Sequence, residues 1–109
     1  MEKKSAILNM EHLAQYTASN PGLEAELLGL FQAQSRVQLI ELRRAAVEND
    51  VPAWKFALHT LKGMAQSLGA MAVADAAGAL EQELPGVAGL HGLEACLQAC
   101  ELEILRRSA

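Results

Sequence analysis

The stretch ALHTLKGMAQSLGA, residues 57–70, carries apolar side chains at the three- and four-residue steps of one helix face. With the residues just before it, this stripe comprises Trp54, Leu58, Leu61, Ala65 and Leu68. Gly63 lies within the same run, although glycine inside a helix costs about 1 kcal/mol relative to alanine. The stretch therefore predicts a core helix that accepts a glycine for a reason other than helix stability.

The composition favours helix along the whole chain of 109 residues. Alanine and leucine dominate, β-branched residues are few, aromatic residues make up 4% and there are three prolines. A chain of this length supplies one core. We therefore expect one all-α domain over residues 1–109, with residues 1–5 and 108–109 frayed.

The charge pattern excludes several classes of partner. The net charge is −4 and the nine Lys and Arg residues are scattered, which argues against nucleic-acid binding. No apolar run approaches the roughly 20 residues of a membrane span. The start MEKKSAILNM lacks the apolar segment and cleavage site of a signal peptide. We expect a cytoplasmic protein without nucleic-acid or membrane partners.

Caps and hydrophobic periodicity divide the chain into helices. The expected elements are a short helix capped by Asn9 over 10–19, a turn over 19–22, a long helix from Leu23 to about Glu48, a third helix opened by Asp50 and Pro52 and ended by Gly69, a fourth helix over 71–84, a loop over 85–92, and a last helix from about Gly92 to Arg107. Four amphipathic helices with short connections predict an antiparallel four-helix bundle with a short extra N-terminal helix.

Each long helix has a predicted inward stripe. The inward positions are Leu28, Phe31, Ser35, Leu39, Leu42 and Ala46 in the second helix, Val73, Ala76, Leu80 and Leu84 in the fourth, and Leu93, Leu97, Cys100 and Ile104 in the last. The fourth helix is also rich in small residues, which permit close packing.

The face beside the core stripe of residues 57–70 carries the chemistry. His59, Lys62, Gly63 and Gln66 stand at offsets of zero, three, four and seven residues. A neutral imidazole is a nucleophile near pH 7, and a phosphoryl group on it brings roughly two negative charges. Lys62 would offset part of that charge, and Gly63 would leave a notch for a partner's backbone. This pattern predicts phosphoryl acceptance and donation by His59.

The string HTLKGMAQSLGA is similar to the signature of the histidine-containing phosphotransfer (Hpt) domain family. The matching positions are His59, Lys62, Gly63, Ala65, Leu68 and Gly69. The segment FQAQSRVQLIELRRAAVENDVPAWKFAL resembles the family's second helix and its approach to the histidine, including an aromatic, Trp54, five residues before it. The resemblance spans roughly residues 8–83.

This resemblance implies a bundle whose exposed His59 passes a phosphoryl group to and from aspartates of response-regulator receiver domains. In the family a Gln or Glu on the neighbouring helix often binds the far imidazole nitrogen, and the matching residue is Glu81. A solvated helix residue is the other interpretation of Glu81. Gln66 matches a position that is often small or polar, where it either contacts a phosphoryl oxygen or is simply exposed.

The resemblance also implies the partners. They are a receiver domain and an upstream histidine kinase or hybrid kinase, with Mg²⁺ supplied by the receiver and no cofactor of the chain's own. No glycine-rich ATP-binding string occurs, so we expect a carrier and not an enzyme. We further expect a monomer, and the MEKK start favours a free-standing protein. Candidate docking residues are Gln38, Arg43, Lys55, Met64 and Gln66, of which Lys55 is the strongest.

Two other functions stay open at this point. One is a helical adaptor with a vestigial histidine, which would bind its partner normally after His59→Gln. The other is a metal or cofactor carrier that uses His59 with Cys96 or Cys100. These cysteines are four residues apart, but reduced core residues are the simpler interpretation, and no nearby histidine completes a zinc set. His12 and His91 lack a Lys-Gly companion, so we expect neither to carry phosphate.

Overall fold

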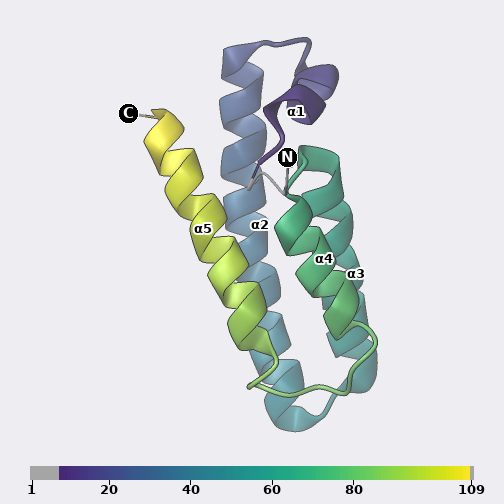
Figure 1. The fold of residues 1–109 in the computed structure, drawn as a ribbon. Coiled ribbons are helices and arrows are strands. Elements are labelled where there is room, and N and C mark those ends of the chain that lie inside the picture. Colours follow the sequence, from purple (N-terminus) through teal and green to yellow (C-terminus); the bar gives the residue numbers. More distant parts are fainter. Residues whose placement is uncertain (1–7, 109) are drawn as a thin grey trace, which may run out of the picture.

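Helix α3 (Val51–Leu68) packs against α2 (Pro21–Glu48) and α4 (Met71–Leu80). The computed structural model describes residues 8–108, which form five helices and no strand. Helix α5 (Leu90–Ser108) returns beside α2 and α4, and the short α1 (Met10–Thr17) packs on α2 and α3 (Figure 1). This arrangement confirms the predicted antiparallel four-helix bundle with an extra N-terminal helix. The expected fraying of residues 1–5 and 109 lies outside the described residues, whereas Ser108, which we also expected to be frayed, is the last residue of α5.

The helix starts follow from the predicted caps. Asn9 Oδ1 accepts a hydrogen bond from the His12 amide at 3.1 Å, and Asp50 Oδ1 accepts one from the Ala53 amide at 3.2 Å. A side-chain acceptor at these positions satisfies an amide that the first helical turn leaves without a partner. Gly69 ends α3 in the left-handed conformation, with φ of 74°. All three residues act as the sequence predicts.

Helix α2 begins two residues earlier than expected. Asn20 is its N-cap, accepting from the Leu23 amide, and Pro21 occupies the first turn, where its missing N–H costs nothing. The predicted turn at 19–22 was therefore wrong in its second half. At about 1.5 Å per residue, the 28 residues of α2 span the long dimension of the bundle, which measures 41 Å.

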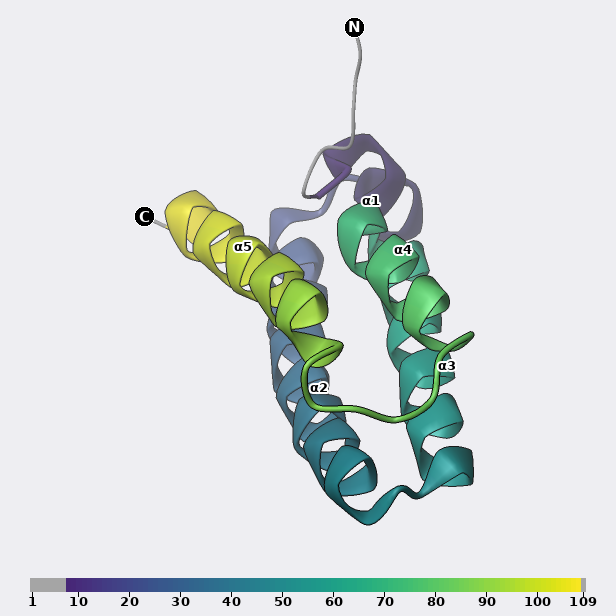
Figure 2. The ribbon, with the colours of Figure 1, turned by 60° about the horizontal axis from the view of Figure 1, so that its bottom comes forward.

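Helix α4 is shorter than predicted, because it ends at Leu80 and not at residue 84. A proline at position 85 would clash with the carbonyl four residues before it, which belongs to Glu81, and it disfavours helical geometry at Leu84. Leu84 is consequently 80% exposed, whereas the sequence placed it in the core. The chain then crosses the end of the bundle to reach α5 (Figure 2).

Helix α5 begins at Leu90, two residues before the expected start, and Leu90 is fully buried. Most predicted inward positions are buried; Leu39, Ala46, Ala76 and Leu97 are only half-buried. Of these, Leu39 and Leu97 face a groove between α2 and α5, which diverge toward the C-terminus of α5 (Figure 1).

Candidate functional site

His59 projects from the outer face of α3, and 74% of its side chain is exposed. Gly63 and Gln66 are exposed on the same helix, while Lys62 is partly covered, with 30% of its side chain exposed. Trp54, on the opposite side of α3, is fully buried. The predicted division of α3 into a core face and an exposed or partly covered face is therefore present.

Glu81 reaches this face from the C-cap position of α4. Its Oε2 atom lies 3.5 Å from His59 Nδ1, and its Oε1 atom lies 2.8 Å from Lys62 Nζ. Only 16% of the Glu81 side chain is exposed. One carboxylate thus stands between the imidazole ring and the ammonium group, and Glu81 is not a solvated helix residue.

The charge of Glu81 is stabilised by its neighbours. The hydrogen bond from Lys62 is the main cause that lowers the pKa of the Glu81 carboxyl below its usual 4.5. Burial opposes this shift, while the charge of Lys62 and the interaction with His59 add to it. Glu81 is therefore a carboxylate at neutral pH. A carboxylate facing Nδ1 favours the tautomer with its proton on Nδ1, which leaves the lone pair of the other ring nitrogen, Nε2, to react.

Lys62 lies on this carboxylate, whereas the sequence placed its ammonium near a group attached to His59. Gly78 of α4 lies beside the lysine stem, because a Cβ at that position would be in ordinary contact with Lys62 Cδ, at 3.4 Å. Sequence reasoning did not identify Gly78. In the sequence, only the small residues of α4 indicated that another segment packs closely against this helix.

The end of α4 is held by side chains of α3. Trp54 Nε1 donates a buried hydrogen bond to the Leu80 carbonyl at 3.3 Å, and Lys55 Nζ donates to the Glu81 carbonyl at 2.6 Å. These carbonyls lie at the C-terminal end of the helix, where the regular amide partners of an α-helix run out. The Leu80 carbonyl also accepts a hydrogen bond from the Glu83 amide at 3.0 Å. The two side-chain contacts connect the end of α4 to α3. The sequence placed Lys55 on the docking rim and Trp54 only in the core.

Gly63 has open space around it. A Cβ built at this position meets no atom within 4 Å among those outside its own helical turn. Packing among residues 8–108 therefore does not require the absence of a side chain here. Gln66 lies one turn further along α3, and it is exposed as well.

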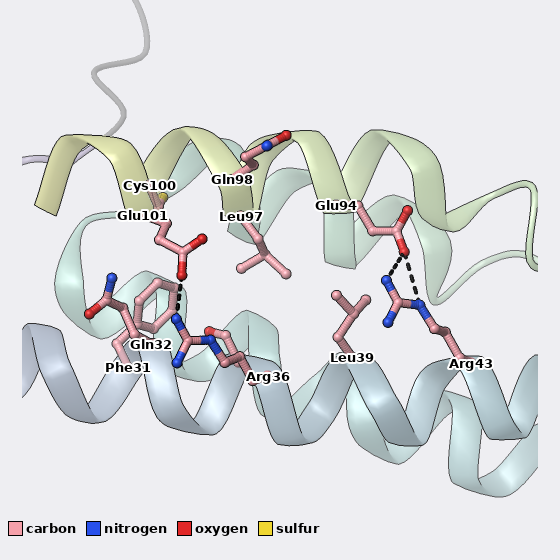
Figure 3. Close-up of a pocket in the computed structure, with 11 residues that line it drawn as sticks. Phe31, Gln32, Arg36, Leu39, Arg43, Glu94, Leu97, Gln98, Cys100 and Glu101 are labelled. Carbon is pink, nitrogen blue, oxygen red and sulfur yellow. Dashed lines mark hydrogen bonds and ion pairs between the residues drawn. The ribbon is translucent and has the colours of Figure 1, made fainter. Parts of the chain in front are cut away.

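Arg43, another predicted docking residue, faces a different part of the bundle. Its guanidinium binds Glu94 of α5 at 2.7 Å, across a groove of about 320 Å³ (Figure 3). Arg36 and Glu101 form a second ion pair across the same groove (Figure 3). The described residues that line it belong to α2 and α5, whereas the His59 site is built from α3 and the end of α4.

The remaining candidate side chains are dispersed. Cys100 is buried, which raises the pKa of its thiol to about 11, and Cys96 is half-buried. His91 is exposed in the first turn of α5, and His12 is half-buried in α1. Within residues 8–108, no group of three or more His, Cys, Asp or Glu side chains is placed to hold a metal ion. None of the helices in that range has the length and apolar character needed to cross a membrane.

Comparison with known proteins points to one family. The family model described as "Hpt domain" matches residues 26–108. A histidine phosphotransferase of Caulobacter crescentus, ShpA, is similar in structure, with a TM-score of 0.75, 25% identity, and coverage of 94% of this chain and 91% of that one. The histidine-containing phosphotransfer protein HptB of Pseudomonas aeruginosa shares the fold, with a TM-score of 0.67, 24% identity, and coverage of 94% and 88%. No curated protein sequence matches the chain significantly.

Proposed function

The chain belongs to the Hpt domain family and is a histidine phosphotransfer protein of a two-component phosphorelay, and we propose that His59 is the residue that carries its phosphoryl group. Proteins of this family are phosphocarrier intermediates that interact with kinases and response regulators. The observation that supports His59 is its combination of high exposure with a carboxylate 3.5 Å from Nδ1. Such an arrangement presents Nε2 to an approaching partner.

In the proposed reaction, His59 Nε2 attacks the phosphorus of a phosphoaspartate on a receiver domain. The bond between phosphorus and the aspartate oxygen breaks, and the electron pair leaves with the aspartate carboxylate. The proton on Nδ1 stays in place, so the ring takes up a positive charge as the new nitrogen–phosphorus bond forms. Glu81 stabilises that charge, because its carboxylate faces Nδ1. The reverse reaction returns the phosphoryl group to a receiver.

The neighbouring residues have distinct proposed roles. Lys62 supplies positive charge that offsets the charge of the arriving phosphoryl group. Its ammonium binds the same Glu81 carboxylate that faces the His59 ring. Gly63 provides clearance for the partner, consistent with the open space around it. Gln66, exposed one turn beyond, contacts a phosphoryl oxygen.

We also propose a cellular location, an oligomeric state and partners for the chain. The chain acts as a cytoplasmic monomer and does not phosphorylate itself from ATP. Mg²⁺ belongs to the acidic pocket of the receiver partner, and the chain needs no cofactor of its own. The phosphoryl group reaches it from an upstream histidine kinase or hybrid kinase through a receiver domain.

Phosphoryl transfer from a panel of phosphorylated receiver domains tests the proposal. Wild-type protein, His59→Gln and His91→Gln are compared on a phosphate-affinity gel. His91 is the matched control, because it is also an exposed helical histidine. We expect acid-labile, base-stable label on wild-type and His91→Gln protein and none on His59→Gln. Label that persists in His59→Gln, or no label on wild-type protein from any donor, would contradict the assignment.

A further inference from the structure

Two lysines of α3 bracket His59, and both bind the same residue of α4. Lys55, four residues before His59, donates to the main-chain carbonyl of Glu81 at 2.6 Å. Lys62, three residues after His59, binds the Glu81 carboxylate at 2.8 Å. We propose that Lys55 is a positioning residue for phosphotransfer: it holds the backbone of Glu81 so that the carboxylate faces His59 Nδ1. This inference rests on the proposed function of His59.

The backbone of Glu81 is fixed at both its amide and its carbonyl. Its N–H donates to the Ala77 carbonyl at 3.1 Å, which continues the hydrogen bonding of α4. Its C=O lies at the helix C-terminus, where the chain turns away and a positively charged donor is favoured. Lys55 supplies that donor from the neighbouring helix. Beside it, the buried hydrogen bond from Trp54 fixes the preceding carbonyl, that of Leu80.

The distance between the Glu81 carboxylate and the His59 ring depends on the hydrogen bond from Lys55 in this proposal. The distance of 3.5 Å between Glu81 Oε2 and His59 Nδ1 is already longer than an ordinary hydrogen bond. The turn after Glu81 is short: the amides of Gln82 and Glu83 bond back to Ala79 and Leu80, and the chain then leaves the helix. A small displacement of the Glu81 backbone therefore separates the carboxylate from the ring. Lys62 alone does not prevent this, because it holds the side chain and not the backbone.

The alternative role of Lys55 is that of a basic residue on the docking rim, as the sequence suggested. The two roles predict different losses. A docking lysine contributes to encounter with an acidic partner, so its removal raises the receiver concentration needed for half-maximal transfer. A positioning lysine acts on the His59 ring, so its removal lowers the transfer rate at saturating receiver and changes the ring already in the unphosphorylated protein.

The test compares Lys55→Met with Lys55→Arg in the full chain. Methionine keeps an unbranched side chain but loses the donor, and arginine retains a cationic donor. Arg43→Met is the matched control, because it removes one surface charge at the groove between α2 and α5. The first readout is the ¹⁵N imidazole spectrum of unphosphorylated protein, which gives the fraction of His59 protonated at Nδ1. The second is the transfer rate as a function of receiver concentration.

We expect Lys55→Met to lower the Nδ1–H fraction of His59 and to reduce the saturating rate about three- to tenfold, the size expected for loss of a hydrogen-bonded partner. Lys55→Arg should restore both, and Arg43→Met should change neither. An unchanged His59 spectrum in Lys55→Met would overturn the proposal. So would an effect on only the receiver concentration needed for half-maximal transfer, with the saturating rate unchanged. If wild-type protein accepts no phosphoryl group, the proposed function fails, but the spectrum of the unphosphorylated ring still tests the role of Lys55.

Discussion

Lys62 and Glu81 form a 2.8 Å ion pair beside the exposed ring of His59, so the cation of the site is held by the carboxylate that faces the ring. Before phosphorylation the two charges neutralise each other. The proposed phosphoryl group on His59 would add roughly two negative charges on the face of α3 that also carries Lys62. The ion pair therefore keeps the Lys62 ammonium next to His59. The stem of Lys62 is partly covered, which limits the movement of this ammonium group.

Replacing Lys62 with methionine should slow phosphotransfer without preventing folding. We expect the saturating rate from a phosphorylated receiver to fall about tenfold, because one charged hydrogen-bonding partner of the site is lost. The pKa of the Glu81 carboxyl should rise toward its usual value, since Lys62 is the main cause of its depression. Rapid-quench transfer assays and a ¹³C titration of the Glu81 carboxyl measure the two effects. An unchanged saturating rate would exclude Lys62 from the reaction.

The same ion pair should make stability depend on acid pH. The pKa of Glu81 is lower in the folded protein than its usual 4.5. The stabilisation is therefore complete above the unfolded value and is lost as the pH falls through the lower folded value. At pH 6 we expect Glu81→Gln to reduce the free energy of unfolding by about 0.5–1 kcal/mol, and the difference should vanish on acidification. Urea unfolding followed by fluorescence of Trp54, the single tryptophan, measures this.

A double-mutant cycle isolates the pair. In a Lys62→Met background, Glu81→Gln should cost little further stability, because the partner is already absent. Additive losses would show that the two side chains contribute independently.

How much of this site the sequence predicts depends on the kind of contact. His59, Lys62 and Gly63 follow from spacing along one helix, since residues three and four apart share a face. The position of Glu81 next to them required a resemblance, because it depends on how α4 packs against α3. The hydrogen bond from Lys55 to Glu81 could not be predicted from the sequence. Its acceptor is a main-chain carbonyl, which every residue possesses.

In the fold, too, some features could be predicted from the sequence and others could not. The caps Asn9 and Asp50 act within three residues and were predicted correctly. The end of α4 was not, because the apolar spacing continues to Leu84 while the helix stops at Leu80. The effect of the proline at position 85 on the preceding turn outweighs that spacing. Leu84 could have been placed correctly by giving the proline more weight than the periodicity.

Substitution at Gly69 should be costly, because this glycine ends α3 and lies in close contact with Asn9, the N-cap of α1. Its φ is 74°, and a Cβ would lie 2.7 Å from Asn9 Cβ and 2.9 Å from the Asn9 carbonyl oxygen. We expect Gly69→Ala to reduce the free energy of unfolding by about 2 kcal/mol or more, through left-handed strain together with the clash. Urea unfolding measures the loss. A loss below about 0.5 kcal/mol would show that the Asn9 segment moves aside freely.

Arg43 should be dispensable for phosphotransfer. It binds Glu94 across the groove between α2 and α5, whereas the His59 site is built from α3 and the end of α4. Arg43→Gln should leave the transfer rate within about twofold and cost at most about 1 kcal/mol of stability, as is usual for an exposed pair. Transfer kinetics and urea unfolding measure both. A large rise in the receiver concentration for half-maximal transfer would place the docking surface on this side of the bundle.

Gly63 should show opposite effects on stability and transfer. Because a Cβ at Gly63 meets open space, Gly63→Ala should stabilise the protein by about 0.5–1 kcal/mol, and Gly63→Gln should also raise helix propensity. If a partner closes over His59, the longer side chain of Gly63→Gln should slow transfer while Gly63→Ala has a smaller effect. Gly29→Ala in α2 is the matched control, since it has equally open surroundings: it should stabilise the protein and leave transfer unchanged. Thermal unfolding and transfer kinetics on the three variants separate the two effects, and an unchanged rate in Gly63→Gln would remove the partner-clearance explanation for this glycine.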